Sequence, residues 1–178
     1  SGYFGGKIDE ILMRITDVIL SLPTLMLLIL AVSMFMARGI LIITVIMGVL
    51  GWPFMARVVR SEFLSLKEST FVEAARAMGA SSKRIILRHI LPNAVSMIIV
   101  LVTIDIPDYI FYEATLSFLG FGDPTSPSWG NLVELGWPTM RTAWWVAVFA
   151  GFGVFFASLG FNLLGDGLRD AFDIKIRE

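Results

Sequence analysis

Residues 71–93 read FVEAARAMGASSKRIILRHILPN, a polar and basic stretch set between strongly apolar segments. In its first half, small and apolar side chains recur at positions i, i+3, i+4 and i+7, which predicts a helix with one apolar face. These residues are Phe71, Ala74, Ala75 and Met78. Just before them, Thr70 and Glu73 have the spacing of a capping box, in which each side chain satisfies a backbone amide at the helix start.

The second half of this stretch carries the signals for a tight turn and another helix. Gly79 suits the left-handed conformation that ends a helix. Ser81 or Ser82 can cap a second helix that runs toward Ile90. Pro92 then falls near the first turn of the next apolar segment. We therefore expect residues 69–90 to form two short helices at an angle, joined by a tight turn.

The composition of the whole chain indicates a membrane protein. Of its 178 residues, 56% are hydrophobic and 16% are charged, and the mean hydropathy is +0.79. A soluble domain has about 45–50% apolar and about 25% charged residues. The chain has no cysteine and a single histidine, His89, so thiolate and multi-histidine metal sites are excluded.

Four segments have the length of about 20 mostly apolar residues that a membrane-spanning helix needs. They are residues 18–36, 39–56, 91–121 and 142–165. The sequence therefore predicts an all-α, polytopic transmembrane helix bundle with four spans. Pro23, Pro53 and Pro107 fall within or near these spans, and each is expected to bend its helix.

The distribution of basic residues predicts the orientation of the spans, because cytoplasmic segments are enriched in Lys and Arg. The basic residues gather at the two ends of the chain and in the central loop: Lys7, Arg14, Arg57, Arg60, Lys67, Arg76, Lys83, Arg84, Arg88, Arg169, Lys175 and Arg177. The other two connections carry only Arg38 and Arg141. Both termini and the central loop are therefore expected in the cytoplasm. Trp129, Trp137, Trp144 and Trp145 surround the second outer connection, as in an interfacial aromatic belt.

The central loop has two other interpretations. It could be an ordinary cytoplasmic loop, whose basic residues only reflect the general enrichment of Lys and Arg on the cytoplasmic side. A DNA-binding helix-turn-helix has similar Ala and Gly spacing. A membrane span begins within about a turn of Pro92, which leaves no free domain to enter a DNA groove, so no nucleic-acid partner is expected.

The loop resembles the EAA loop of ABC transporter permeases. The matching residues are Glu73, Ala74, Ala75, Gly79, Ile90, Leu91 and Pro92. Further matches are GYFGGKIDEILMRITDVILSLP near the start, ATLSFLGFG at 114–122, SPSWG at 126–130 and FNLLGDGLRDAFD at 161–173. Together they resemble the second permease subunit of dipeptide, oligopeptide and nickel importers, the dipeptide permease C type.

This resemblance implies a multi-pass protein of the bacterial plasma (inner) membrane with several partners. They are a homologous second permease subunit, cytoplasmic ATP-binding subunits, and a periplasmic or lipid-anchored solute-binding protein, with membrane lipid around them. The EAA loop, residues 69–90, would dock onto the ATP-binding subunits. Such permeases normally have six spans, so residues 1–178 would form a single permease domain holding spans three to six. The start, SGYFGGKIDE, reads like the middle of a longer protein.

The resemblance also implies import of dipeptides or oligopeptides, with nickel or another small solute as the alternative cargo. No catalytic residue, metal site or cofactor is expected in this chain, because ATP and Mg²⁺ would be bound by the partner subunits. The chain's only Gly-Lys pair, Gly6-Lys7, is followed by Ile8, so the phosphate-binding loop of an ATPase is absent.

Three acidic residues stand out in the third span: Asp105, Asp108 and Glu113. A carboxylate in hydrocarbon is costly, so such residues face protein or a water-filled path. They are candidates for a substrate pathway, or they contact other helices or the partner subunit, or lie near the outer interface. Glu113 matches an acidic position of the resembled family, whereas the Asp pair does not.

Two rival functions follow from other classes of protein. One is a membrane-embedded aspartyl hydrolase that would use Asp105 and Asp108 as its catalytic pair, but the chain offers no matched carboxylate on a second helix. The other is a structural membrane protein with four spans.

Overall fold

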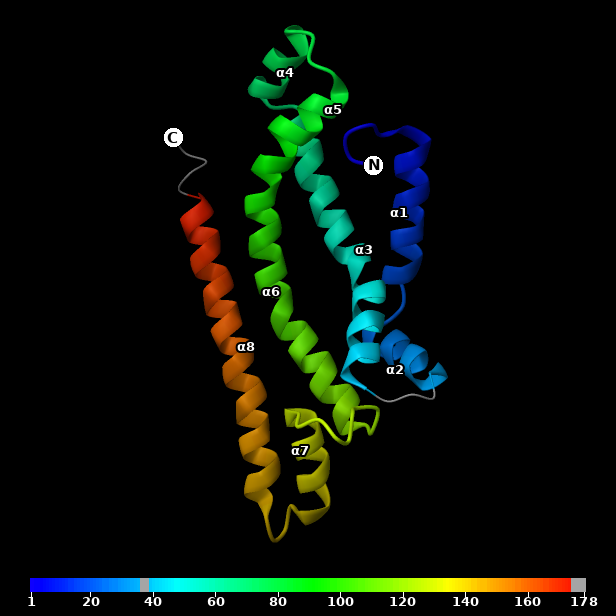
Figure 1. Ribbon diagram of the computed structural model, residues 1–178, viewed down its shortest axis with the longest axis vertical. Helices are drawn as coiled ribbons and strands as arrows, with labels where there is room; N and C mark the ends of the chain where they lie inside the picture. Colours follow the sequence, from blue (N-terminus) through cyan, green and yellow to red (C-terminus); the bar gives the residue numbers. More distant parts are fainter. Residues whose placement is uncertain (36–38, 174–178) are drawn as a thin grey trace. The chain divides into compact units, whose positions relative to one another are not determined.

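The computed structural model describes residues 1–35 and 39–173, and the regular structure of this part is helical throughout (Figure 1). The elements are α1 Gly6–Leu20, α2 Thr24–Met34, α3 Ile40–Lys67, α4 Thr70–Ala77, α5 Ser82–Ile85, η1 Ile86–Ile90, α6 Leu91–Phe118, α7 Trp129–Gly136, η2 Trp137–Thr139 and α8 Trp144–Asp173. Met36, Arg38, Lys175 and Arg177, which the sequence analysis used, lie outside the described residues.

Three of the described helices are long and apolar enough to cross a membrane: Ile40–Lys67, Ser82–Phe118 and Trp144–Phe172. Neither α1 nor α2 is long and apolar enough by itself. Together they have the length and apolar composition of a fourth span, with a break between them. The all-α membrane fold predicted from the sequence is therefore confirmed, with three or four spans.

The bounds of the first two spans differ from those expected. Residues 18–36 do not form one helix, because α1 ends at Leu20 and α2 begins after Pro23. A proline disfavours the helical conformation in the residue before it, and the backbone of Pro23 itself is extended, with ψ of 120°. The second span continues as helix past Ala56 to Lys67, so Arg57, Arg60 and Lys67 belong to a helix and not to the loop.

The second short helix of the central loop is not separate from the next span. Residues Ser82–Phe118 form one continuous helix, with a π-helical turn at Ile86–Ile90 that ends two residues before Pro92. Proline has no N–H, and its ring clashes with the carbonyl of the preceding turn in a regular α-helix. The wider π turn relieves this clash, and Asn93 Nδ2 donates a 2.6 Å hydrogen bond to the His89 carbonyl.

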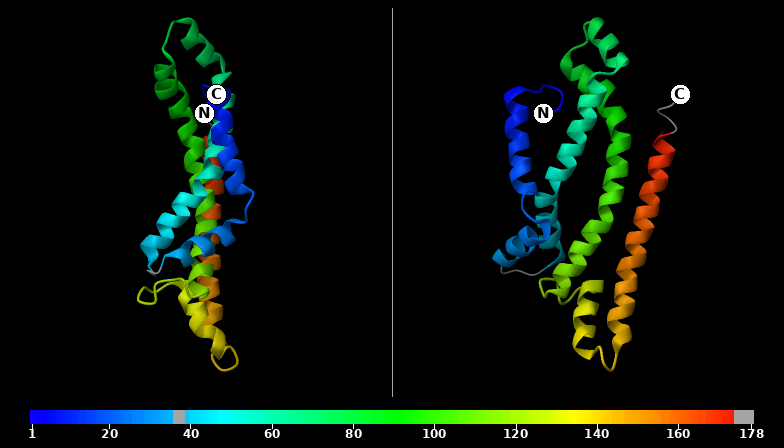
Figure 2. Two further views of the ribbon diagram at one scale, coloured as in Figure 1. Left: turned by 90° about the vertical axis from the view of Figure 1, so that its right-hand side faces the viewer. Right: turned by 180° about the vertical axis from the view of Figure 1, so that it is seen from behind.

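The chain divides into two compact units. One unit holds residues 1–22, 52–102 and the end of α8 from Leu168 onward. Within it, α4 and α5 form a hairpin at the ends of α3 and α6 (Figures 1 and 2). Its buried core consists of Val72, Ala75, Ile85 and Ile90.

The second unit holds residues 23–51 and 103–167. Its core lies among α2, α3 and α6 and consists of Leu28, Val32, Ile43, Ile46, Met47 and Leu116. Helix α7, which the sequence analysis did not predict, lies beside the start of α8 (Figure 2). It also packs closely on α6, because a Cβ atom added at Gly130 would overlap the Ala114 carbonyl and approach Ser117 Cβ to 2.6 Å.

Candidate functional site

The turn between α4 and α5 is a Schellman motif centred on Gly79. Gly79 has φ of +79°, the left-handed conformation that favours glycine. Its N–H donates to the Arg76 carbonyl, and the Ala80 N–H donates to the Ala75 carbonyl, which is the pair of bonds that defines this motif. The predicted left-handed turn at Gly79 is confirmed.

The two helix starts of the hairpin are capped differently. Helix α5 is capped as expected, by the Ser81 side chain, which accepts a 3.4 Å hydrogen bond from the Arg84 N–H. The predicted capping box at Thr70 is wrong, because Ser69 is the N-cap of α4, Thr70 is already helical, and no side chain caps this helix. The Ser69 hydroxyl donates instead to the Leu66 carbonyl at 2.5 Å, so it satisfies the end of α3 and makes no cap bond to α4.

One face of α4 is buried inside the hairpin and the other is open. Val72 and Ala75 are 0% and 2% exposed and pack with Ile85 and Ile90, beside Phe63 and Leu66 of α3. On the other side, Phe71 is 40% and Met78 81% exposed. The predicted apolar face is therefore wrong in part: Ala75 packs within the chain, whereas Phe71, Ala74 and Met78 lie on its surface.

The residues that match the EAA pattern accordingly divide into two groups. Ala75 and Ile90 belong to the buried core of the hairpin, and Leu91 is half-buried. Glu73, Ala74, Gly79 and Pro92 are exposed. The first group holds the hairpin together, and the second group is accessible on its surface.

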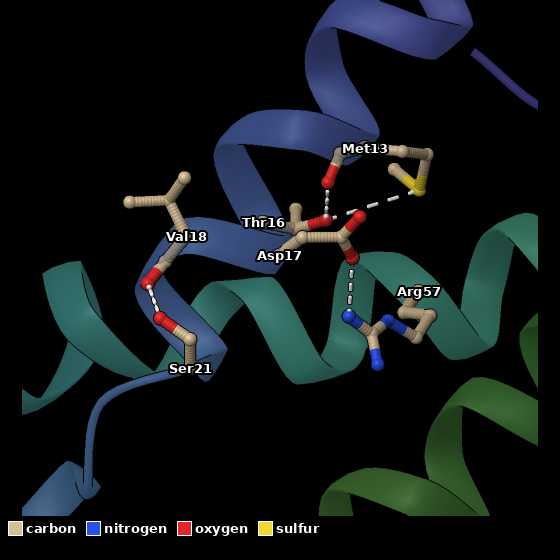
Figure 3. Close-up of polar contacts among 6 residues, drawn as sticks. All are labelled: Met13, Thr16, Asp17, Val18, Ser21 and Arg57. Atoms are coloured by element: carbon tan, nitrogen blue, oxygen red, sulfur yellow. Dashed lines mark hydrogen bonds and ion pairs between the residues drawn. The ribbon is translucent and has the colours of Figure 1, made fainter.

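Two ion pairs, which the sequence analysis missed, connect α1 to α3. Asp17 of α1 accepts a 2.6 Å bond from Arg57 Nη2 of α3, close to the turn where the Thr16 hydroxyl donates to the Met13 carbonyl (Figure 3). Arg60, one turn further along α3, pairs with Asp9. The eight-residue spacing of the aspartates on α1 was the available signal, but only the folded structure shows which arginines they meet.

The start of the chain also contacts the hairpin. Tyr3 packs against the buried core of the hairpin, and Lys67 Nζ lies 5.7 Å from the centre of the Tyr3 ring. This distance is within the range of a cation–π contact. Tyr3 and the end of α3 thus form the base on which the hairpin rests.

A cavity of about 730 Å³ lies in the other unit, between α3, α6 and α7. Glu113 is the acidic residue in its lining, beside Tyr109 and Trp129, and it accepts a 2.6 Å hydrogen bond from the Ser117 hydroxyl. The rest of the lining is mainly apolar. Glu113 is therefore a carboxylate held in a defined position at the edge of a mostly apolar space.

Asp105 and Asp108 do not line this cavity. Asp105 is half-buried and Asp108 is exposed, both on α6. Across residues 1–35 and 39–173, no group of three or more His, Cys, Asp or Glu side chains is arranged to hold a metal ion. The structure therefore distinguishes Glu113 from the Asp pair, which the sequence had placed together.

A multi-span helical protein with an ordered polar hairpin between two of its long helices has the form of a transporter's membrane subunit. The entire chain, residues 1–178, matches the family described as "Binding-protein-dependent transport system inner membrane component", and it belongs to this family. This confirms the identification as an inner-membrane permease, and permeases of this family are not the ATPase subunit of such a system and carry no cofactor. The aspartyl hydrolase interpretation is thereby set aside.

Two relatives show which members of this family the chain is similar to. The chain is 40% identical to the oligopeptide transport system permease protein OppC of Bacillus subtilis over 179 residues, covering 100% of this chain and 58% of that protein. It is 44% identical to the glutathione transport system permease protein GsiD of Escherichia coli over 176 residues, covering 98% of this chain and 58% of that protein. The chain thus spans little more than half the length of the relatives it matches.

Proposed function

We propose that this chain forms part of the membrane pathway of an ATP-driven importer for short peptides. Its similarity to permeases named for oligopeptide and for glutathione transport supports this cargo. Nickel, the alternative cargo, has no support from those names. In this proposal residues 1–178 act as one permease domain corresponding to spans three to six of a six-span subunit. The partners are a second permease, ATP-binding subunits and a solute-binding protein.

The observation that carries the proposal is the open face of α4. The hairpin is packed internally through Val72, Ala75, Ile85 and Ile90, so its fold does not depend on the residues of the other face. Phe71, Ala74 and Met78 remain exposed there. An apolar helix face presented in this way is a typical recognition surface for a groove on another protein. We infer that this face, together with Glu73, docks onto the ATP-binding subunit.

Substitutions at neighbouring alanines test this docking. Ala74→Leu adds bulk on the exposed face, so the hairpin should fold and the permease should insert, while docking is blocked. Ala74→Ser, which keeps the residue small, is the control and should behave like the parent. The readouts are substrate-stimulated ATP hydrolysis and uptake by the reconstituted complex, and cross-linking of a cysteine at Met78 to the ATP-binding subunit.

The buried alanine gives the contrasting result. Ala75→Leu has to fit into the packed core of the hairpin and should lower its stability, by about 1–3 kcal/mol for an overpacked site. If Ala74→Leu assembles, hydrolyses ATP and transports like the parent, α4 is not the coupling element and the proposed docking is refuted.

The orientation in the membrane is part of the proposal. The excess of basic residues in the central loop and at the ends of the chain supports a cytoplasmic hairpin and cytoplasmic termini. A cysteine at Ser82 should resist a membrane-impermeant thiol reagent in intact cells and react after the membrane is opened. Labelling in intact cells would reverse this orientation.

For the substrate pathway we propose Glu113 as the first residue to test. Its place in the lining of the cavity and its hydrogen bond from Ser117 support a role for its charge. Glu113→Gln preserves an oxygen acceptor for Ser117 and removes the charge, so a loss of peptide uptake in an assembled complex would report on the charge itself. Asp108→Asn, on the same helix but outside the cavity, is the comparison, and Asp105→Asn completes the set. Equal uptake by the Glu113→Gln variant and the parent would remove Glu113 from the pathway.

A further inference from the structure

A small pocket of basic residues lies at the start of the long helix that follows the hairpin. Its volume is about 420 Å³, and it is lined by Ser81, Lys83, Arg84, Leu87 and Arg88, here called the basic pocket. All five residues are exposed. Three of them are cations, Lys83 and Arg84 on one turn of the helix and Arg88 on the next, so they concentrate positive charge at one concave site.

These cations have no acidic partner within the described part of the chain. The ion pairs found there involve Arg57 and Arg60, and no acidic side chain lines the basic pocket. The opposite side of the same helix, at Ile85 and Ile90, is buried in the hairpin. The three charges are therefore directed away from the protein core and are available to an external anion.

The position of the basic pocket along the helix fits the headgroup layer of a membrane. After Leu87, the next large exposed apolar side chain is Val95, and others continue through Ile99 and Val102. At 1.5 Å per residue, Arg88 lies roughly 10 Å before Val95, which is comparable with the polar layer of about 5–8 Å on each side of the hydrocarbon core. Long basic side chains at such a position extend toward the headgroups.

Leu87 further favours a lipid over a protein partner. It is 51% exposed in the middle of the cations, and no residue of α4 lines the basic pocket. A charged groove on an ATP-binding subunit would have to desolvate the three cations and would offer no apolar partner to the leucine. A phospholipid instead offers a phosphate to the cations and glycerol or acyl carbons to the leucine.

We propose that the basic pocket binds the phosphate of an anionic phospholipid in the cytoplasmic leaflet. Clusters of Lys and Arg directly cytoplasmic of a membrane span attract anionic headgroups. The bound lipid would hold the first turn of this helix, which belongs to the hairpin, at a fixed depth in the membrane. This inference uses the cytoplasmic orientation proposed above, but it is independent of the transported solute.

The test uses the full-length permease, purified with its co-expressed partner subunits, in phosphatidylcholine nanodiscs with or without phosphatidylglycerol. A photoactivatable phosphatidylglycerol should label the peptide containing residues 83–88, and the matching phosphatidylcholine probe should not. In the triple variant Lys83→Gln, Arg84→Gln, Arg88→Gln, we expect the apparent affinity to fall at least about tenfold, since each basic residue near an anionic surface contributes roughly a fivefold preference.

Two control variants separate the site from general charge and from misfolding. The triple variant Lys7→Gln, Arg14→Gln, Arg169→Gln removes the same charge outside the basic pocket and should keep the label. Arg88→Lys keeps the charge and should also keep it. Co-purification of the partner subunits shows that each variant is folded.

Four results would overturn the proposal. They are equal labelling by the phosphatidylcholine probe, undiminished labelling of the basic-pocket triple variant, competition by inorganic phosphate at low concentration, and cross-linking of a cysteine at Leu87 to an ATP-binding subunit. The third result would assign the basic pocket to a soluble anion, and the fourth to a protein interface. The docking test at Ala74 is unaffected by any of them, so failure of one proposal is distinguishable from failure of the other.

Discussion

Arg60 of α3 donates two hydrogen bonds of 2.6 Å to the carboxylate of Asp9 on α1, from Nε to Oδ1 and from Nη2 to Oδ2. This bidentate geometry is the strongest form of the arginine–carboxylate contact. The neighbouring pair, Arg57 with Asp17, has a single bond, and about half of each side chain is exposed. The two ion pairs thus join the same helices but differ in geometry and in access to water.

The first prediction compares these two pairs. Asp9→Asn should lower the thermal unfolding temperature of the purified permease more than Asp17→Asn, because exposed single-bond pairs contribute little. In a double-mutant cycle, Asp9→Asn and Arg60→Gln together should cost less than the sum of the two single changes. Equal effects of the Asp9 and Asp17 variants would show that the bidentate pair adds nothing.

The second prediction concerns the turn at Gly79. A Cβ atom there meets no atom within 4 Å, so the cost of a side chain is in the backbone alone. Gly79→Ala should destabilise the hairpin by about 1 kcal/mol, and Gly79→Asn by less, because asparagine tolerates the left-handed conformation better. Hydrogen exchange of the α4 amides measures this difference. If the hairpin couples to an ATPase, Gly79→Trp should also lower transport.

The third prediction tests the contact between α7 and α6. Gly130→Ala places a methyl group against the Ala114 carbonyl, whereas Gly151 of α8 has no atom within 4 Å of the corresponding position. Gly151→Ala should therefore be neutral or stabilising by up to about 1 kcal/mol, since alanine favours helices over glycine. Gly130→Ala should destabilise by about 1–3 kcal/mol as an overpacked site. Thermal unfolding in detergent measures both, and the same sign for both would refute the close contact.

The fourth prediction is a pH dependence in the loop that precedes α7. The Thr125 hydroxyl and the Thr125 N–H both donate hydrogen bonds to the Asp123 carboxylate. These bonds, the hydroxyl bond more than the N–H bond, hold the pKa of Asp123 below its usual value. A lowered folded-state pKa contributes stability at pH values above the ordinary pKa of aspartate, and this contribution is lost as the pH falls through the lowered value.

Removing the hydroxyl tests this cause. Thr125→Val should raise the pKa of Asp123 toward its ordinary value while the backbone bond remains. The carboxyl ¹³C chemical shift of an aspartate-labelled sample reports the pKa directly. Thr139→Val, at the end of η2, is the control. An identical change in the pKa of Asp123 in both variants would contradict the assignment.

Local rules predicted the parts of this fold that depend on neighbouring residues. The spans follow from runs of apolar residues, and the turn at Gly79 follows from the lack of a Cβ atom. Helix α7 was missed because it is short and lies between other turn signals, although Ser128 caps it through the Asn131 N–H.

The features that could not be predicted depend on contacts between residues far apart in the sequence. The period of α4 was correct, but only Val72 packed against Phe63, Leu66, Ile85 and Ile90 shows which side is covered. The pairing of α3 with α1 also could not be predicted from neighbouring residues, because Asp9 and Arg60 are 51 residues apart. The same holds for the extension of α3 past Ala56, since the paired Arg57 and Arg60 lie in that extension. Separating Glu113 from Asp105 and Asp108 likewise needed the positions of α3 and α7.

The buried core of the hairpin has a consequence for how a partner binds. A segment that folds only on binding loses conformational entropy at that moment, and its affinity is reduced accordingly. Here Val72, Ala75, Ile85 and Ile90 are ordered by the chain itself, so that loss has occurred before any partner arrives. A preorganised surface of this kind converts more of its contact energy into affinity. If a partner displaced α4, Phe63 and Leu66 of α3 would have to move with it, because the core of the hairpin packs against them.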